Sequence, residues 1–449
     1  MLVSRVLVLG FLLAALLVTA SLMVNAKPAQ ADTTFTVSRT DDFGDPDLGD
    51  GECGFFSARG GRACSLRAAI GQANATPGRD TINFNIGGTI GVKTIPVASD
   101  LPDITDPLAI DGYSQPGSSL NTLAKGTNAV LMVQLDGNDT AGNGIEIVAD
   151  DVVVRGLAIG RFNFNGIEVD DAEGVGAPSG VRIQGNFVGT DASGTVAQPN
   201  RFNGLNLRES GGDNTVGGAS PSQRNLISGN GANGISIGTG NDGYAIEGNL
   251  IGTKKDGTSA LGNDNDGVTL SSATDNFVGE FSASAANTIA FNGGDGVNVV
   301  GEDTVGNRIL SNSIFSNGRL GIDLVGGTEN AAGGTANDTG DRDTGPNALQ
   351  NKPVVTSAKT VGGTTTIQAK LNSTPSDPFF VQFFSNPSGN EGQKLIGSKS
   401  VTTNSNGNVT FTFTPSQAVS VGQTVTATAL DVVGGNTSEF SGPRAVAAS

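Results

Sequence analysis

The sequence predicts an all-β protein whose middle is a solenoid, with a small cap before it and a β-sandwich after it. One asparagine recurs among similar neighbours at Asn186, Asn249 and Asn312, at successive offsets of 63 residues. A second pattern, Asn/Asp-Gly-apolar-x-apolar, recurs at Gly144, Gly166, Gly204, Gly234, Gly267, Gly296 and Gly321. Glycine supplies 67 of 449 residues while Val, Ile, Leu and Phe stay frequent, which is typical of many short strands joined by tight turns. Repeats of this length predict coils that bury their apolar faces only against neighbouring coils.

Residues 1–31 are expected to be a signal peptide. Arg5 precedes an almost wholly apolar run over 6–24, and Ala29-Gln30-Ala31 fits an A-x-A cleavage site. The run is also long enough to span a bilayer, so a retained anchor is the alternative. Cleavage after Ala31 would release an exported, secreted or surface-associated chain that begins at Asp32 and has no other membrane span.

The expected mature chain is strongly acidic. Without Arg5 and Lys27 it keeps 24 basic against 43 acidic residues, a net charge near -19. Such a charge disfavours nucleic acid and anionic membranes, whose binding needs clustered Lys and Arg. A solvated acidic surface explains it, and divalent cations or a cationic partner are the alternative.

Missing residue types exclude several chemistries. The chain has no His, so Ser-His-Asp and Cys-His mechanisms and His-ligated metals are excluded. The two cysteines, Cys53 and Cys64, are close in sequence, and in an exported protein such a pair predicts a disulfide.

Residues 32–100 are expected to cap the solenoid. Ser65 is placed to cap a short helix from Leu66 to Ala73, and Thr81 to Ile86 alternates as the first strand. The segment Cys64-Ser65-Leu66-Arg67-Ala68-Ala69-Ile70, with an Asp/Gly-rich approach to Cys53, resembles the CSLREA domain of exported bacterial β-helix proteins. Ala68-Ala69 stands where that family usually has Glu-Ala, so any role of the glutamate is not inherited.

Residues 101–335 are expected to form the solenoid. Residues 181–237 align with 244–299, and each block of 62–63 residues carries two Asn/Asp-Gly motifs, so it should make two coils of about 31 residues. The short β-branched strands resemble the right-handed parallel β-helix of pectate-lyase-like proteins. Asn186, Asn249 and Asn312 then form one column, as turn residues that tolerate left-handed backbone or, alternatively, as ligand groups.

Residues 336–352 are expected to be an acidic linker. Asp338, Asp341 and Asp343 have the Asp-x-Asp-x-Gly beginning of a calcium loop but lack the later glutamate of an EF-hand. They are the metal candidates, with Ca²⁺ as the ion, and ordinary linker chemistry is the alternative; no other cofactor is expected.

Residues 353–449 are expected to form a sandwich. About seven short alternating strands are separated by Gly/Asn turns, among them 364–371, 379–384, 409–413 and 424–430. The segments 426–431 and 435–441 resemble the Ig-like domains that end many exported bacterial β-helix proteins.

An acidic corner supplies the catalytic candidates. Aligning Gly144 with Gly166 sets Asp150-Asp151 opposite residues 172 and 173, and a carboxylate column there could bind Ca²⁺ or catalyse glycoside cleavage with an arginine as base. The candidates are Asp150, Asp151, Asp170, Asp171, Glu173 and Arg182. Solvated corners between strands are the alternative.

These features favour a non-enzymatic structural or adhesion protein that contacts extracellular polysaccharide or the cell surface. A polysaccharide lyase or glycoside hydrolase acting on an anionic polysaccharide is the alternative, and it depends mostly on analogy of fold.

Overall fold

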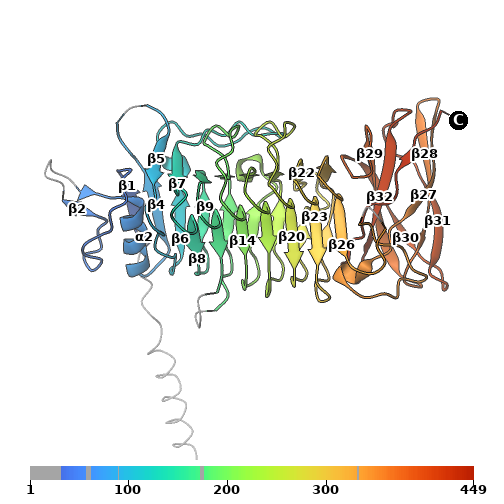
Figure 1. The fold of residues 1–449 in the computed structure, drawn as a ribbon, viewed down its shortest axis with the longest axis horizontal. Helices are drawn as coiled ribbons and strands as arrows, with labels where there is room; N and C mark the ends of the chain where they lie inside the picture. Colours follow the sequence, from blue (N-terminus) through green and yellow to red (C-terminus); the bar gives the residue numbers. More distant parts are fainter. Residues whose placement is uncertain (1–31, 57–61, 89, 172–175, 331–332, 449) are drawn as a thin grey trace, which may run out of the picture.

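The computed structural model describes residues 32–56, 62–88, 90–171, 176–330 and 333–448, so the predicted signal peptide lies outside the described residues. The described chain is elongated. A small cap lies at one end, a stack of parallel strands fills the middle, and two antiparallel sheets form the other end (Figure 1).

Within the described residues, the parallel strands form three long sheets, as in a parallel β-helix. The nine-stranded sheet contains β1 (Thr34–Val37), β4 (Asp80–Phe84), β6 (Leu108–Asp111), β9 (Val153–Arg155), β12 (Arg182–Gln184), β15 (Thr215–Gly217), β18 (Ala245–Glu247), β21 (Phe277–Val278) and β24 (Arg308–Ile309). The eight-stranded sheet contains β5 (Lys93–Pro96), β7 (Val133–Asp136), β10 (Leu157–Gly160), β13 (Phe187–Val188), β16 (Leu226–Ile227), β19 (Leu250–Ile251), β22 (Thr288–Ala290) and β25 (Ser313–Phe315). The seven-stranded sheet contains β8 (Ile145–Ile147), β11 (Ile167–Val169), β14 (Leu205–Leu207), β17 (Ile235–Ile237), β20 (Val268–Ser271), β23 (Val297–Val300) and β26 (Ile322–Val325). The predicted all-β fold with long parallel sheets is confirmed.

The Asn/Asp-Gly motif sets the register of the seven-stranded sheet. Ile167 pairs with Ile145 on one side and Leu205 on the other, and all three are buried. The motif glycine is required by close approach, because a Cβ at Gly144 would lie 2.3 Å from the carbonyl oxygen of Gly166 in the next coil. The Oδ1 of each motif Asn or Asp from 143 to 295 accepts the backbone N–H of the equivalent residue one coil later.

The predicted asparagine column is a continuous ladder of amide hydrogen bonds. Asn186, Asn249 and Asn312 lie in it, but Asn225 and Asn287 alternate with them, and each Nδ2 donates to the next Oδ1 at 2.9–3.4 Å. The coil lengths at this column are therefore unequal, 39 and 24 residues, rather than two of about 31.

The prediction that these asparagines themselves adopt left-handed backbone is wrong. The left-handed residues are the ones that precede them in sequence, Gly185, Gly248 and Ser311, with φ of 66°, 65° and 59°. The asparagines stay buried and use their amides to hold neighbouring coils together.

A helix and a disulfide build the N-terminal cap. Helix α2 (Leu66–Ala75) begins at Ser65, whose Oγ accepts the Ala68 N–H at 3.1 Å, as predicted. Strands β2 (Phe55–Phe56) and β3 (Arg62–Ala63) pair beside it, and a disulfide joins Cys53 to Cys64, as predicted. The first strand was missed: β1 lies at the start of the cap, before α2 in sequence, and pairs with β4.

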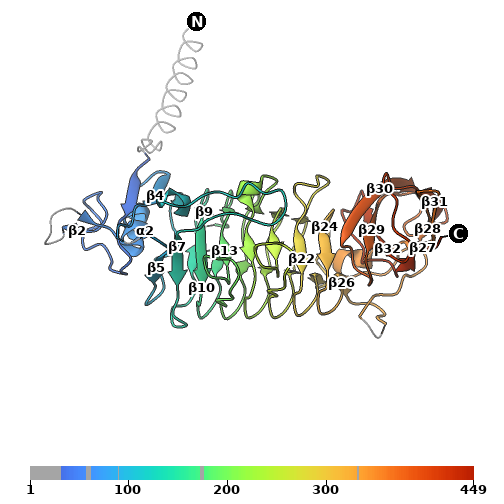
Figure 2. The same cartoon turned by 90° about the horizontal axis from the view of Figure 1, so that it is seen from above.

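A strap, residues 115–132, covers the outer face of the eight-stranded sheet (Figure 2). It follows the 3₁₀ turn η1 (Gly112–Ser114) and packs Ala129 and Leu131 on outward-facing apolar residues of that sheet. The buried Arg224, just after the 3₁₀ turn η2 (Pro221–Gln223), donates to the strap carbonyls of Leu123, Ala124 and Gly126.

Two antiparallel sheets form the C-terminal end. One contains β27 (Val354–Val361), β28 (Thr364–Asn372) and β31 (Asn408–Phe413); the other contains β30 (Lys394–Thr402), β29 (Pro378–Asn386), β32 (Thr424–Asp431) and β33 (Arg444–Ala445). Their facing side chains make a separate apolar core that includes Phe379, Phe383 and Val425.

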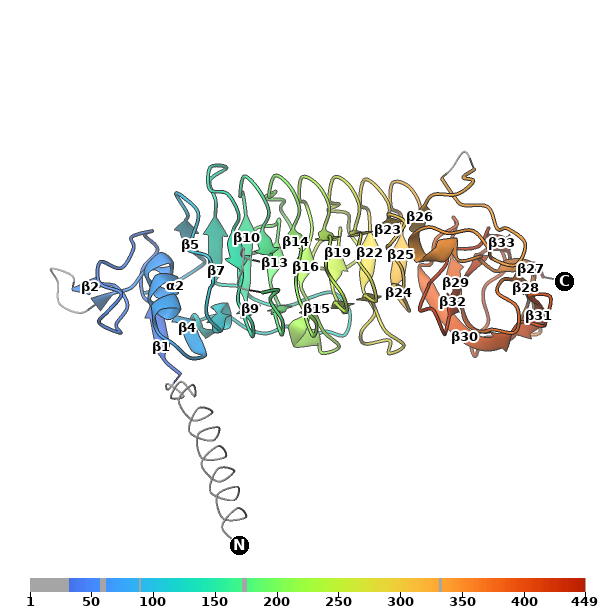
Figure 3. The ribbon, with the colours of Figure 1, turned by 90° about the horizontal axis from the view of Figure 1, so that it is seen from below.

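This sandwich sits on the last coil of the parallel stack (Figure 3). Ile314 in β25 exchanges two backbone hydrogen bonds of 3.0 Å with Gly392, and Phe384 and Phe440 join the apolar core of the stack. The connecting residues 336–352 are packed as well, since the turn η3 (Pro346–Leu349) buries Asn347 and Leu349.

Candidate functional site

The outward side chains of the seven-stranded sheet form a single polar row along the stack. The second residue of each strand faces away from the core. The register aligns these residues, which are Glu146, Glu168, Asn206, Ser236, Thr269, Asn298 and Asp323. We call these seven residues the sheet-face row. Sequence reasoning missed its two glutamates, although each is the x of the repeat motif, a position that strand alternation sends outward.

Glu168 is the most buried member of the row. Its carboxylate accepts from Asn165 Nδ2 at 2.6 Å, Asn206 Nδ2 at 2.8 Å and Arg208 Nε at 3.2 Å. Burial raises the pKa of Glu168, and these donors lower it in part. Burial likewise raises the pKa of the neighbouring Glu146. A raised pKa suits a general acid, but the carboxylate of Glu168 is already held by three donors.

The predicted acidic corner does not assemble. Asp150 accepts from the N–H of Ser179 at 2.7 Å, and Val153 pairs with Arg182, so the alignment that set Asp150-Asp151 opposite residues 172 and 173 is wrong. The connection from β11 to β12 is longer than the one from β8 to β9. Asp151 has left-handed backbone, with φ of 56°, and Asp171 accepts the backbone N–H of Gly176. Glu173 lies outside the described residues.

Two other corner candidates are separated from each other. Asp170 forms an ion pair with Arg208, beside Glu168 on the seven-stranded sheet. Arg182 lies in β12 of the nine-stranded sheet and donates to the carbonyl of Gly180. The arginine that meets carboxylates is therefore Arg208 rather than Arg182.

An exposed aromatic pair lies at the loop edge of the sheet-face row. Phe164 and Phe202, on adjacent coils, stack with ring centroids 5.7 Å apart and ring planes 12° apart. Their exposed fractions are 50% and 45%. Arg201 donates to Asn163 Oδ1 at 2.9 Å beside them. A flat apolar surface with amide and guanidinium neighbours can contact a sugar ring or an apolar side chain.

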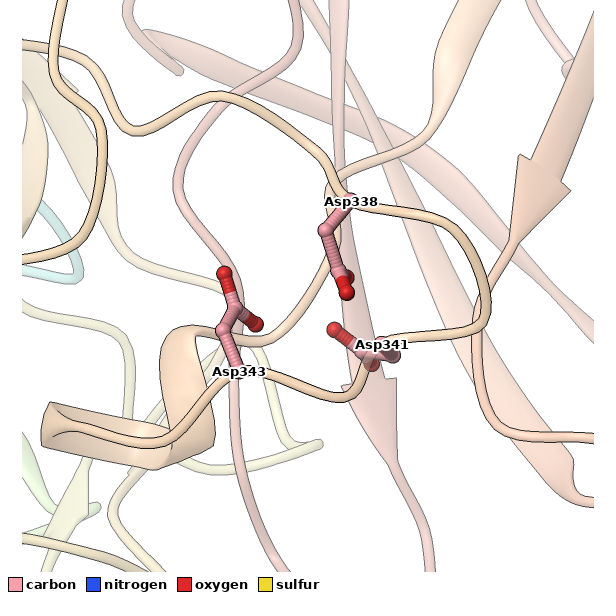
Figure 4. Close-up of side chains that lie close together, drawn as sticks. All are labelled: Asp338, Asp341 and Asp343. Carbon is pink, nitrogen blue, oxygen red and sulfur yellow. The ribbon is translucent and has the colours of Figure 1, made fainter.

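The linker candidates do come together. Asp338, Asp341 and Asp343 turn their carboxylates toward a common point between the stack and the sandwich (Figure 4). One ligand atom from each lies within 4.8 Å of the others, and within the described residues this is the group of three acidic side chains close enough to share a metal ion. We call it the Asp338 triad.

The three carboxylates of the triad are partly buried and lie close enough to repel one another. Burial, together with the negative charges of Asp343 and Asp338, raises the pKa of Asp341 to about 6. Asp341 accepts from Asn351 N–H at 2.9 Å, and Asp338 accepts from Arg342 N–H at 3.0 Å. Carboxylate oxygens in this arrangement could contribute to a calcium site, which would need further oxygen ligands to complete it.

No protein-family model matches this chain, and no curated protein matches it either. The CSLREA and Ig-like resemblances therefore remain predictions. Within the described residues, no helix is long and apolar enough to cross a membrane.

Proposed function

We propose that the chain is exported, loses its leader after Ala31, and works as a rigid, non-enzymatic structural or adhesion module on or near the cell surface. In this proposal residues 32–100 are a CSLREA-type cap, the parallel stack is a right-handed β-helix, and the sandwich is an Ig-like domain. The disulfide between Cys53 and Cys64 supports an oxidising compartment.

The closed architecture carries this proposal. The sandwich covers the last coil and supplies hydrogen-bond acceptors to it, and the strap covers the outer face of the eight-stranded sheet. The seven-stranded sheet, with the sheet-face row and the Phe164–Phe202 pair, is therefore the surface available to a partner. An extended polysaccharide running along the stack is the partner that such a flank suits.

A lyase or hydrolase is the second candidate, because Glu146 and Glu168 are neighbours with raised pKa and Arg208 lies beside them. The bonds that already hold Glu168 disfavour it as a catalytic acid.

A panel of neutral and anionic polysaccharides tests both candidates. Purified residues 32–449 should bind at least one polymer and release neither unsaturated nor new reducing ends. The variant F164A/F202A should bind less than a control, V196A, that alters an exposed apolar residue elsewhere. Product formation abolished by E168Q would replace our proposal with the enzyme, and no binding to any polymer would remove the polysaccharide partner.

A further inference from the structure

A buried carboxylate with one free oxygen lies at the N-terminal end of the stack. Asp80 begins β4 and is 1% exposed. Its Oδ1 accepts the backbone N–H of Thr33 at 2.8 Å, whereas its Oδ2 is buried and has no hydrogen-bond partner in the part of the chain that the structure describes. A buried carboxylate oxygen without a partner is costly, so this position calls for a donor or a cation.

The charges around Asp80 make a donor or a cation at its free oxygen still more favourable. Burial raises the pKa of Asp80, and the negative charges of Asp106 and Asp32 raise it further. Within the described residues no ion pair joins Asp80 to a lysine or arginine, and the adjacent Arg79 is exposed. Asp106 already accepts from the N–H of Gly78 at 3.2 Å.

The chain itself brings a nitrogen to this place. Asp32 immediately precedes Thr33, and its side chain accepts the N–H of Arg79 at 3.4 Å, which holds Asp32 against the start of β4. Successive backbone nitrogens lie about 3–4 Å apart by covalent geometry. The nitrogen of Asp32 is therefore one residue from the N–H that already bonds to Asp80.

We propose that removal of the leader completes this site: the new α-ammonium of Asp32 pairs with the free oxygen of Asp80 and locks β1 onto β4. A signal peptidase hydrolyses the bond between Ala31 and Asp32. Water is consumed, the leader leaves with a C-terminal carboxylate, and the released amine takes up the proton. With an ordinary pKa near 8, the amine is mostly charged at pH 7. The inference depends on the proposed export and cleavage.

The test compares two forms of the mature chain. One begins with a free Asp32 α-amine, left by cleavage of a fusion, and the other carries a Gly-Ser extension before Asp32. Amide hydrogen exchange of β1 and β4 should be about tenfold slower in the form with the free amine, because a pair present only in the folded state suppresses local opening. Exchange in β23 should be the same in both forms.

Two substitutions separate the pair from a general charge effect. D80N keeps an acceptor for Thr33 and should make the two forms exchange alike. D106N removes the same charge from a neighbouring residue and should leave the difference intact. Equal exchange in the two wild-type forms overturns the proposal, whether or not D80N folds. Restoration of slow exchange in the extended form by millimolar calcium also overturns it, in favour of a cation site.

N-terminal sequencing of the exported protein gives an independent check. We expect Asp32 as the first residue. A different first residue in normally exported protein overturns the pair but leaves the proposed structural role intact, whereas loss of polysaccharide binding bears only on that role.

Discussion

At the scale of single residues, buried amide side chains supply hydrogen-bond donors and acceptors to the backbone at the corners of the coils. A buried Asn in a β-helix corner donates and accepts at once, so a column of them satisfies backbone groups in two coils and links the coils to one another. Asn249 donates to Val216 O at 2.9 Å and to Asn287 Oδ1 at 3.0 Å, and it accepts from Asn225. Every hydrogen-bonding group of the amide is used, which favours the structural interpretation of this column over a ligand site.

Replacing Asn249 should therefore be costly. N249A removes the donor to the carbonyl of Val216 and the acceptor for both the backbone N–H and the Nδ2 of Asn225. We therefore expect the free energy of unfolding to fall by about 2–4 kcal/mol. Denaturant unfolding measures it. N265A, at an exposed bend between β19 and β20 of the same coil, should change stability by no more than about 0.5 kcal/mol. Equal effects of the two substitutions would contradict the ladder.

Asp323 ends the sheet-face row in an acidic neighbourhood. Burial, together with the negative charges of Asp295 and Glu439, raises its pKa to about 7. Its Oδ1 and the Oδ1 of its cross-strand partner Asn298 are both buried and have no hydrogen-bond partner among the described residues. A protonated Asp323 could donate where an ionised one could not.

The stability of the protein should depend on pH through this residue. An unfolded Asp loses its proton near pH 4 and the folded Asp323 near pH 7, so its contribution to the free energy of unfolding decreases as pH rises between those values. D323N stays neutral and should be more stable than the natural protein at pH 8, by about 1 kcal/mol after solvent screening, and nearly equal at pH 4. Thermal unfolding at both pH values measures this, with D303N on the exposed surface as control. A stabilisation of D323N that is the same at both pH values would contradict this assignment.

At the scale of elements, the sequence predicts strands better than it predicts coil geometry. The strand at 364–371 matches β28, and the helix at Leu66 matches α2, because alternation and a serine cap are local signals. The acidic corner failed because twelve residues separate β11 from β12 whereas five separate β8 from β9, and no local signal reveals this difference in length. Asn225 and Asn287 correspond to each other in the duplicated blocks, but they were not placed in the asparagine column because a fixed period does not reveal alternating coil lengths. The Asp338 triad could be predicted because its members are close in sequence.

The disulfide should stabilise its own element more than the stack. Cys53 and Cys64 are 11 residues apart, and the chain-entropy model gives a loop of this size about 3 kcal/mol. The variant C53S/C64S should increase proteolysis and amide exchange in the cap and leave β17 to β26 unchanged, because solenoid stability is mostly a sum over neighbouring repeats. S65A, which removes the N-cap of α2, should also destabilise the cap, by about 1 kcal/mol. Exchange that rises equally in all coils would show one cooperative unit instead.

At the scale of the whole molecule, a solenoid has two open ends, and each end exposes unpaired strand groups that favour association. This chain covers one end with α2 and the other with the sandwich, and a single apolar core runs from Phe35 in β1 to Phe440 after β32. The motif column stops accordingly: Asp295 accepts the backbone N–H of Leu320, and the apolar side chain of Leu320 offers no acceptor for a further coil. The side chain of Phe440 lies against Gly321 instead.

Glu391 is a side chain that joins the sandwich to the last coil of the parallel stack. It reaches from the sandwich to accept the backbone N–H groups of Ser316 and Asn317, and also Asn317 Nδ2. Asn317 ends a second ladder of amide hydrogen bonds, which runs through Asn200, Asn230, Asn263 and Asn292. E391A leaves three donors without an acceptor, so we expect about 2–3 kcal/mol less stability at the joint and faster amide exchange at residues 313–317. E391Q keeps one oxygen acceptor and should lose less. Because the opened joint exposes the edges of the last coil, E391A should also associate more than the natural chain in light scattering at equal concentration. If exchange rises in the sandwich alone and association does not change, the sandwich is an independent domain rather than the cap of the stack.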